Sequence, residues 1–161
     1  MSVLDAQPVV ALLLGEPGAR AVASVLRDQE DRPSISSANV AEIVDVLIRG
    51  AGQRGDDVLE KIDWLVAGGL RILPLDEETA RLTGQLRATY YDRRARPVSL
   101  GDCFALATAI RLDEALVTAD PVLVGIARAE GCTVIGVPDS QGRLPDGHRR
   151  RSLVRCSPQE R

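Results

Sequence analysis

The sequence predicts an α/β sandwich, in which helices pack on both faces of a mainly parallel sheet of about five short strands. Short apolar runs alternate along the chain with longer segments of helical periodicity, and this alternation is typical of a parallel sheet. The 161 residues suit one domain of ordinary size, which can bury a core without disulfides or a metal. An apolar share of 45% and a charged share of 27% are those of a globular protein.

Short apolar runs predict the strands. Each run is bounded by residues that favour turns or helix caps, such as proline, glycine, aspartate or serine. The predicted strands are residues 3–6, 34–36, 70–75, 115–118 and 132–137.

The segments between these runs predict helices. Residues 38–49 have the clearest pattern, with apolar side chains at i, i+3, i+4, i+7 and i+8 counted from Val40. The S-L-G-D motif at 99–102 has the spacing of a capping box, and the Asp-Pro pair at 120–121 marks another helix start. The predicted helices are residues 8–14, 19–29, 38–49, 56–67, 77–94 and 99–112, and a last one that begins at 120–121.

The order of these elements indicates where ligands bind. In the usual doubly wound arrangement, the first strand lies centrally, beside a later strand, at the point where the winding reverses. Ligands of such folds bind outside the carboxyl ends of the strands at this switch point. Side chains that follow the strands are therefore the first candidates for function.

The chain divides into a folded part and a polar end. Residues 1–138 are expected to form the domain, and residues 139–161 a flexible tail outside the core. The tail carries six arginines against three acidic residues, so the preceding part has a net charge of −6 within the total of −3.

The composition excludes several classes of function. His148 is the single histidine, Lys61 is the single lysine, and aromatic residues make up only 2%. These counts exclude a ribonuclease that uses two histidines, and they argue against a His-rich zinc site and against the stacking surfaces of RRM or OB-type domains. Because the charge balance is acidic, work on a phosphate backbone would have to proceed through bound cations.

The cysteines and the N-terminus indicate a cytoplasmic protein without a membrane partner. The three cysteines are odd in number and widely spaced, so neither a disulfide framework nor a structural zinc site is expected. The apolar run at 9–14 is too short for a signal sequence or a membrane helix.

Four acidic residues are predicted to meet at the carboxyl edge of the sheet. Asp5 ends the first strand, Asp120 follows the strand 115–118, and Glu42 and Asp102 lie in the first turns of their helices. Carboxylates held close together repel one another and raise each other's pKa, unless a hard divalent cation neutralises them. The four residues thus predict a Mg²⁺ or Mn²⁺ site, which suits a phosphodiester substrate.

Each of these acids also has a structural explanation. Asp102 can be the capping-box carboxylate of its helix, and Asp120 can be an N-cap followed by proline. Glu42 lies opposite the apolar stripe of its helix, where a solvated surface acid would lie. Asp5 is the hardest to explain structurally, because aspartate is disfavoured in strands. The joint placement of all four residues favours a site.

Motifs around the four acids carry a resemblance to a known family. They are V-L-D-A with V-V-A-L-L-L-G-E-P-G at the N-terminus, S-S-A-N-V-A-E-I around Glu42, S-L-G-D-C-F-A-L-A-T-A around Asp102 and L-V-T-A-D around Asp120. Together, and in this order over residues 2–137, they resemble PIN-domain ribonucleases of the VapC toxin type. The resemblance implies a PIN-like three-layer sandwich, with residues 1–138 as the nuclease domain.

The resemblance also implies an activity. It is Mg²⁺- or Mn²⁺-dependent endonucleolytic cleavage of RNA, in which water activated by the metal attacks the phosphodiester bond. Asp5, Glu42, Asp102 and Asp120 match the family's acidic quartet, and they are the expected catalytic residues and metal ligands. On this reading Asp5 and Asp102 bind the metal directly, whereas the other two act through water or complete a second position.

Supporting residues follow from the same motifs. Thr118 matches the small hydroxyl residue often found beside the last acid of the family, and Asn39 is a second candidate for support of the site. Arg93, Arg94 and Arg96 are expected near the metal edge, where they would contact phosphates. A solvated helix end is the alternative for these arginines.

The implied partners are an RNA substrate, a cognate antitoxin protein and a second copy of the chain in a homodimer. Trp64, Leu65 and Ile62 are either core residues or, if exposed, candidate contacts for an antitoxin helix. Two other functions remain open. Gln7 stands where family members often have serine or asparagine, which leaves room for a catalytically weak scaffold that acts as a binding module. The other is a PIN nuclease that acts on DNA, or in RNA processing without an antitoxin.

Overall fold

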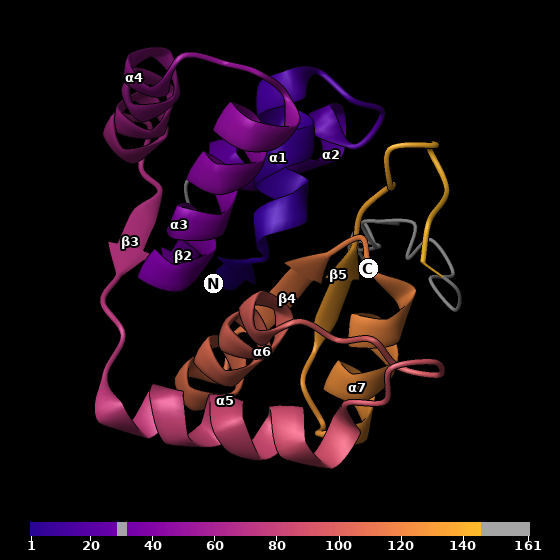
Figure 1. The fold of residues 1–161 in the computed structure, drawn as a ribbon. Coiled ribbons are helices and arrows are strands. Elements are labelled where there is room, and N and C mark those ends of the chain that lie inside the picture. The colour runs from indigo at the N-terminus through magenta and orange to yellow at the C-terminus, as the bar shows by residue number, and fades with distance from the viewer. Residues whose placement is uncertain (29–31, 146–161) are drawn as a thin grey trace, which may run out of the picture.

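The computed structural model describes residues 1–28 and 32–145, and it confirms the predicted α/β sandwich (Figure 1). The strands form one parallel sheet in the order β3-β2-β1-β4-β5. The first strand is central, as predicted, and the winding reverses between β1 and β4. The strands are β1 (Ser2–Leu4), β2 (Ser34–Ser36), β3 (Arg71–Leu73), β4 (Ala115–Thr118) and β5 (Val134–Gly136).

Helices cover both faces of the sheet. In Figure 1, α1 to α4 lie above the sheet, and α5 to α7 lie below it. Among the described residues, no single helix is long and apolar enough to span a membrane; α1 and α2 have the length and composition only as a pair bent by 108°. The helical elements are α1 (Ala6–Leu14), α2 (Ala19–Arg27), α3 (Ser37–Asp45), the π-helical turn η1 (Val46–Gly50), α4 (Gly55–Ala67), α5 (Glu77–Tyr90), α6 (Leu100–Leu112) and α7 (Pro121–Ala129).

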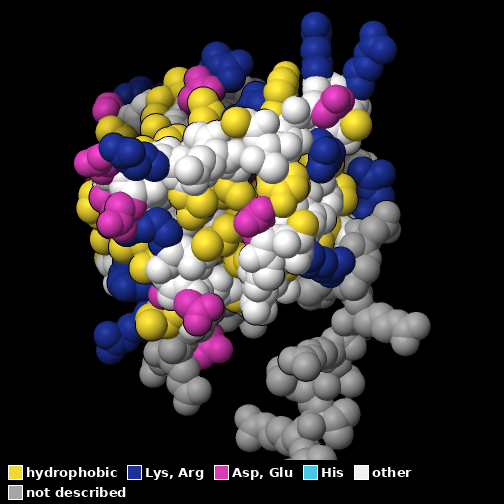
Figure 2. Space-filling view, turned by 90° about the horizontal axis from the view of Figure 1, so that it is seen from below, with side chains coloured by type: hydrophobic (Ala, Val, Ile, Leu, Met, Phe, Trp, Pro, Cys, Tyr) yellow, Lys and Arg dark blue, Asp and Glu magenta, His cyan; other side chains and the backbone are white. Residues whose placement is uncertain are grey.

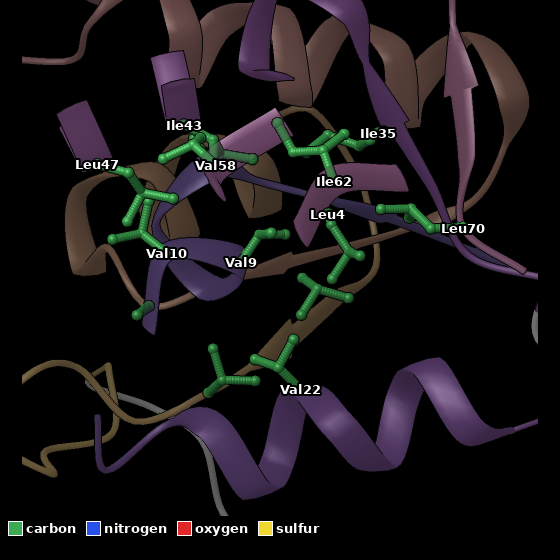
Figure 3. Close-up of a cluster of buried hydrophobic side chains, with 14 residues drawn as sticks. Leu4, Val9, Val10, Val22, Ile35, Ile43, Leu47, Val58, Ile62 and Leu70 are labelled. Atoms are coloured by element: carbon green, nitrogen blue, oxygen red, sulfur yellow. The ribbon is translucent and has the colours of Figure 1, made fainter. Parts of the chain in front are cut away.

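Alternation along the central strands divides the core into two layers. Leu4 and Val117 pack with the buried side chains of α1 to α4, as Figure 3 shows for Leu4. Val3 and Leu116 point to the other face and pack with α5 to α7. Successive side chains of a strand point to opposite faces, so a strand buried on both sides needs apolar residues at every position. This burial holds β1 and β4, and the residues that follow them, in fixed positions.

Several predicted boundaries are wrong by a few residues. The strand predicted at 3–6 ends at Leu4, because the Asp5 side chain accepts a hydrogen bond from the N–H of Ala6 and caps α1. The first helix therefore begins two residues before the predicted start at Pro8. The strands predicted at 70–75 and 132–137 are shorter at both ends.

The helix predicted at 77–94 ends at Tyr90, and a tight turn follows. Asp92 and Arg96 pair in an isolated antiparallel bridge, and the Asp92 carboxylate accepts hydrogen bonds from the N–H groups of Arg94 and Ala95. Local hydrogen bonds from an aspartate compete with the helix in this way. Arg94 and its neighbour Arg93 therefore lie in an exposed turn and not in a helix.

The first part of the predicted tail forms a turn against the domain. The N–H of Asp139 donates to the carbonyl of Arg143, and the Asp139 carboxylate accepts from the N–H of Arg143. The preceding Pro138 packs so closely on the α1–α2 connection that a Cβ at Gly18 would lie 2.5 Å from its carbonyl oxygen. Residues 146–161 of the predicted tail lie outside the described residues.

Candidate active site

Asp5 lies at the switch point of the sheet. Its N–H donates a hydrogen bond to the carbonyl of Val117 in the neighbouring strand β4 (3.0 Å). The carboxylate is almost completely buried and accepts two hydrogen bonds, from the N–H of Ala6 (2.8 Å) and from the hydroxyl of Thr118 (2.8 Å). Thr118, itself fully buried, thus fixes the orientation of the Asp5 carboxylate.

Asp5 has an unusual proton affinity. Burial and the charges of Asp102 and Glu42 raise the pKa of its carboxyl to about 7, although the hydrogen bonds from Thr118 and Ala6 lower it. Burial penalises the charged form of an acid, and nearby negative charges add to this effect. A carboxyl that gains or loses its proton near neutral pH is a frequent feature of functional sites.

Glu42 projects from α3 toward the first turn of α6. Its Oε2 atom is buried without a hydrogen-bond partner, and it lies where a side chain at Gly101 would collide with it. Burial raises the pKa of Glu42, and the charges of Asp102 and Asp45 add to this. The interpretation of Glu42 as a solvated surface acid is therefore wrong. A buried carboxylate oxygen without a partner is costly and needs a reason.

Asp102 and Ser99 form the capping box predicted at the start of α6. The Asp102 carboxylate accepts from the N–H of Ser99 (2.6 Å), and the Ser99 hydroxyl accepts from the N–H of Asp102 (3.0 Å). Burial raises the pKa of Asp102 and the charge of Asp120 raises it further, whereas the hydrogen bonds of Ser99 and the charge of Arg87 lower it.

Asp120 caps α7. Its Oδ1 atom accepts hydrogen bonds from the N–H groups of Val122 (2.6 Å) and Leu123 (3.3 Å), and its own N–H donates to the Thr118 hydroxyl (3.2 Å). The structural explanations of Asp102 and Asp120 are thus correct, and the two carboxylates are nevertheless close enough to influence each other. A capping role and a place in the acidic cluster are compatible.

Asn39 joins the two helices that carry Glu42 and Asp102. It is fully buried, and its amide nitrogen donates to the carbonyl of Gly101 at the start of α6 (3.0 Å). Its amide oxygen accepts from the hydroxyl of Ser36, the N-cap of α3 (2.5 Å). A buried amide with fixed partners on two elements determines how these elements sit against each other.

The three arginines predicted near the metal edge lie in the turn after α5 and in the loop that leads to α6. They are exposed, and in the part of the chain that the structure describes none of them forms a hydrogen bond or ion pair with the four acids. The Arg96 guanidinium lies 5.7 Å from the centre of the Tyr90 ring. The structure thus groups the four acids, which we call the acidic cluster, with Thr118 and Asn39. Arg93, Arg94 and Arg96 lie outside this group, on the exposed surface.

Two residues near the acids escaped the sequence analysis. Gly101 provides the space that Glu42 occupies, and a glycine inside a capping-box motif was its only signal. Arg87 of α5 lowers the pKa of Asp102, lies 3.4 Å from the centre of the Tyr91 ring and has a buried Nε without a partner. No local motif indicates Arg87, because its position depends on how α5 packs on α6.

The donor set suits a hard divalent cation. Mg²⁺ and Mn²⁺ prefer carboxylate oxygens, and the unpartnered Oε2 of Glu42 is such an oxygen. Hydrogen bonds hold the carboxylates of Asp5, Asp102 and Asp120 in their cap positions. In these positions, no three acidic, histidine or cysteine side chains within residues 1–28 and 32–145 form a group that could hold one metal ion.

The sequence matches the PIN domain family over residues 2–129. The chain belongs to the PIN domain family. Both the resemblance predicted from the motifs and the PIN-like three-layer fold are thereby confirmed. The search of curated proteins found no match to the sequence.

Solved structures resemble this PIN domain over most of its length. FitAcB from Neisseria gonorrhoeae is 27% identical, with a TM-score of 0.58, 84% of this chain covered and 96% of the other. Mycobacterium tuberculosis VapC20, described as a Sarcin-Ricin loop cleaving toxin, is 16% identical, with a TM-score of 0.61 and coverage of 83% and 97%. A toxin–antitoxin complex from Klebsiella pneumoniae is 20% identical, with a TM-score of 0.52 and coverage of 74% and 87%. The PIN fold of this chain is common to these proteins.

Proposed function

We propose that this PIN domain is a Mg²⁺- or Mn²⁺-dependent endoribonuclease of the cytoplasm and the toxin of a VapBC-type toxin–antitoxin pair. The observation that carries the proposal is the meeting of Asp5, Glu42, Asp102 and Asp120 at the switch point of a PIN-family sheet. Ligand sites of parallel α/β sheets lie at this edge. Burial and mutual repulsion raise the pKa values of three of these acids, Asp5, Glu42 and Asp102, and such a group suits a cationic cofactor.

The proposed roles follow from the contacts of each side chain. Asp5 and Asp102 would hold the cation directly, and Glu42 and Asp120 would act through water or at a second position. A bound Mg²⁺ or Mn²⁺ would supply Lewis acidity, which lowers the pKa of bound water and offsets charge on the phosphate oxygens. Thr118 keeps the Asp5 carboxylate turned toward the cluster.

The described side chains near the acids do not favour a protein nucleophile. Cys103 follows Asp102 directly, and burial together with the Asp102 charge raises the pKa of its thiol to about 11. A thiol with such a pKa stays protonated at neutral pH and is a poor nucleophile. Attack by water is therefore the mechanism that these residues favour.

The choice of RNA and of an antitoxin partner has two kinds of support. Several solved structures with this fold are of toxins or toxin–antitoxin complexes, and one of these toxins cleaves the Sarcin-Ricin loop. On this chain, α4 leaves Leu59 53% exposed and Val66 43% exposed, and their spacing of seven residues puts both on one face; Trp64, 65% exposed, lies about 140° from Leu59 around the helix. Exposed apolar side chains on one helix suit a partner helix, so we assign this surface to the antitoxin.

A cleavage assay tests the proposal. The purified protein is incubated with single-stranded RNA and with single-stranded DNA while Mn²⁺ is titrated, and the variants Asp5→Asn and Asp102→Asn are compared with Asp56→Asn. Asp56 is an acid on α4 with a side chain 92% exposed, so it controls for the loss of one charge. We expect RNA cleavage that EDTA stops, that both cluster variants lose and that Asp56→Asn keeps.

The other outcomes are informative. Cleavage of DNA alone would retain the nuclease and overturn its assignment to RNA. Binding of Mn²⁺ and RNA without cleavage would favour the binding module, which the exposed Gln7 in the first turn of α1 leaves open. Full activity in EDTA would refute the metal role.

A further inference from the structure

A hollow of about 310 Å³ lies along α7, from Pro121 at the start of the helix to Ala129 at its end. Its lining includes Pro121, Val122 and Gly125 from α7, and Tyr90 and Arg96 from the end of α5 and the following turn. Pro121 directly follows Asp120, so the hollow begins beside the fourth acid. The volume is in the range of pockets that take small organic groups.

The lining has the chemistry of a nucleotide site. The Tyr90 ring is held at one end, because its hydroxyl donates to Glu130 (2.5 Å), and the Arg96 guanidinium lies over the ring. The floor at Gly125 is open, since no atom lies within 4 Å of the place where a Cβ would be. An aromatic ring and apolar floor suit the faces of a nucleobase, and the arginine suits its phosphate.

A second hollow of about 390 Å³ adjoins the first at Pro121. Its wall includes Ala119, and Arg143 and Leu144 of the C-terminal turn. The Arg143 guanidinium donates a hydrogen bond to Asp139, which holds it in the wall of this hollow. Arg143 is thus the second arginine, after Arg96, that lines the two hollows. Two hollows that meet beside the fourth acid, each with an arginine, fit an extended strand better than one compact ligand.

We propose that a single-stranded RNA segment crosses the start of α7 at Pro121 and runs along this helix, and that the hollow of Tyr90, Arg96 and Gly125 holds one unpaired base of that segment. The inference rests on the proposed nuclease function and adds a site that selects one base of the substrate. Bases of a duplex are stacked and paired, so only an unpaired base can enter the hollow. Arg96, which the sequence placed near phosphates, contacts the phosphate of that nucleotide.

Filling the hollow tests this site without relying on cleavage. Gly125→Leu places a side chain in the open floor, and Gly84→Leu is its control, since Gly84 is also an exposed glycine inside a helix with no atom within 4 Å. Leucine is a better helix former than glycine, so both variants should fold. Both are made in the Asp5→Asn background, and binding to dye-labelled oligo(A), oligo(C) and oligo(U) of about 12 nucleotides is followed by fluorescence anisotropy.

We expect Gly125→Leu to weaken binding of the preferred oligonucleotide about tenfold, the effect of losing one stacked base. Gly84→Leu should bind as the parent does, Arg96→Glu should bind more weakly, and Arg96→Lys should recover part of the affinity. A paired RNA of the same length should not distinguish Gly125→Leu from the parent.

The inference is overturned if Gly125→Leu binds all three oligonucleotides as tightly as the parent does. It is also overturned if light scattering shows that Gly125→Leu changes the oligomeric state, because the hollow would then be a protein interface. The cleavage assay on the unsubstituted protein judges the nuclease separately. If the protein cleaves RNA but Gly125→Leu has no effect on binding, this site is overturned and the nuclease stands. If Gly125→Leu weakens binding but the protein does not cleave RNA, the nuclease is overturned and the hollow is an RNA-binding site without a role in cleavage.

Discussion

At the scale of single residues, Asp5 combines two tasks that usually fall to different side chains. It caps α1, and it places a buried acid beside β4. The cap is served equally well by asparagine, which has the same shape and a carbonyl oxygen. The two tasks can therefore be separated by one substitution.

Asp5→Asn should stabilise the protein at neutral pH in EDTA. With a pKa of about 7 in the folded state against 3.8 unfolded, Asp5 keeps its proton in the folded state while the unfolded chain releases it. Stability from this group is therefore present below about pH 4 and is lost as the pH rises to about 7, by up to about 1.4 kcal/mol per pH unit. Asparagine does not titrate, so urea unfolding from about pH 5 to pH 8 should give a flatter stability profile. If stability changed with pH as steeply in Asp5→Asn as in the parent, this prediction would be contradicted. Asp56→Asn is the control, and its stability profile should keep the slope of the parent.

Gly101→Ala should reduce cleavage without unfolding the protein. The new methyl group occupies the space of Glu42 Oε2, so the Glu42 side chain must turn away while the backbone stays in place. A displacement of a functional group by about 1 Å can cost on the order of 10²-fold in rate. Cleavage rate and melting temperature are measured together, with Gly84→Ala as the control. A rate equal to that of the parent would show that Glu42 has no part in the reaction.

The sequence was sufficient to place the acids but not the groups around them. Asp5 and Asp120 follow strands and Asp102 opens a helix, and these positions can be inferred from element order alone. The roles of Gly101 and Arg87 depend on which residues of α3 and α5 face α6. One sequence contains no signal for such contacts between elements.

At the scale of elements, the contact between α3 and α6 determines the geometry of the site. Asn39 and Gly101 connect the two helices through one hydrogen bond, 62 residues apart in sequence. Glu42 and Asp102 lie one turn or less from this bond. The distance between their carboxylates therefore depends on a polar contact between the helices as well as on apolar packing.

Asn39→Ala should both destabilise the fold and lower activity. It leaves the partly buried carbonyl of Gly101 without its side-chain donor, which costs about 1–3 kcal/mol. Thr108→Val is the matched control, because Thr108 is a buried polar residue of α6 whose hydroxyl donates to the carbonyl of Phe104 in the same helix. Urea unfolding and the cleavage rate are compared at a temperature where both variants are folded. Equal rates for the two variants would contradict a positioning role for Asn39.

The boundaries of elements were less predictable than their order. The π-helical turn η1 continues α3 to Gly50, although the apolar periodicity predicted one α-helix to residue 49. Asp92 ends α5 early by hydrogen bonds to its own turn. Both departures arise from backbone hydrogen bonding, which side-chain periodicity does not report.

At the scale of the whole molecule, part of the negative charge is concentrated at one edge of the sheet. The part before residue 139 carries a net charge of −6, and four of its acids meet at one edge of the sheet. This repulsion opposes folding, and a bound cation would offset it. A metal that binds only the folded state stabilises that state by mass action.

Mn²⁺ should therefore raise the melting temperature in a concentration-dependent way. The gain is about 2.7 kcal/mol at 100 times the dissociation constant. Because Asp5 must lose its proton to bind a metal, the effect should be larger at about pH 8 than at about pH 6. Thermal melts of the parent, Asp102→Asn and Asp56→Asn measure it. An equal rise in Asp102→Asn would place the metal elsewhere.

The strand order also has a consequence for protein synthesis. The hydroxyl partner of Asp5, Thr118, is made 113 residues after it. The pairing of β1 with β4 cannot form before that strand has left the ribosome. At about 5–20 residues per second, a nascent chain spends several seconds or more with Asp5 made and Thr118 missing. In a chain proposed to cleave RNA, the site around Asp5 thus cannot assemble until β4 has been made.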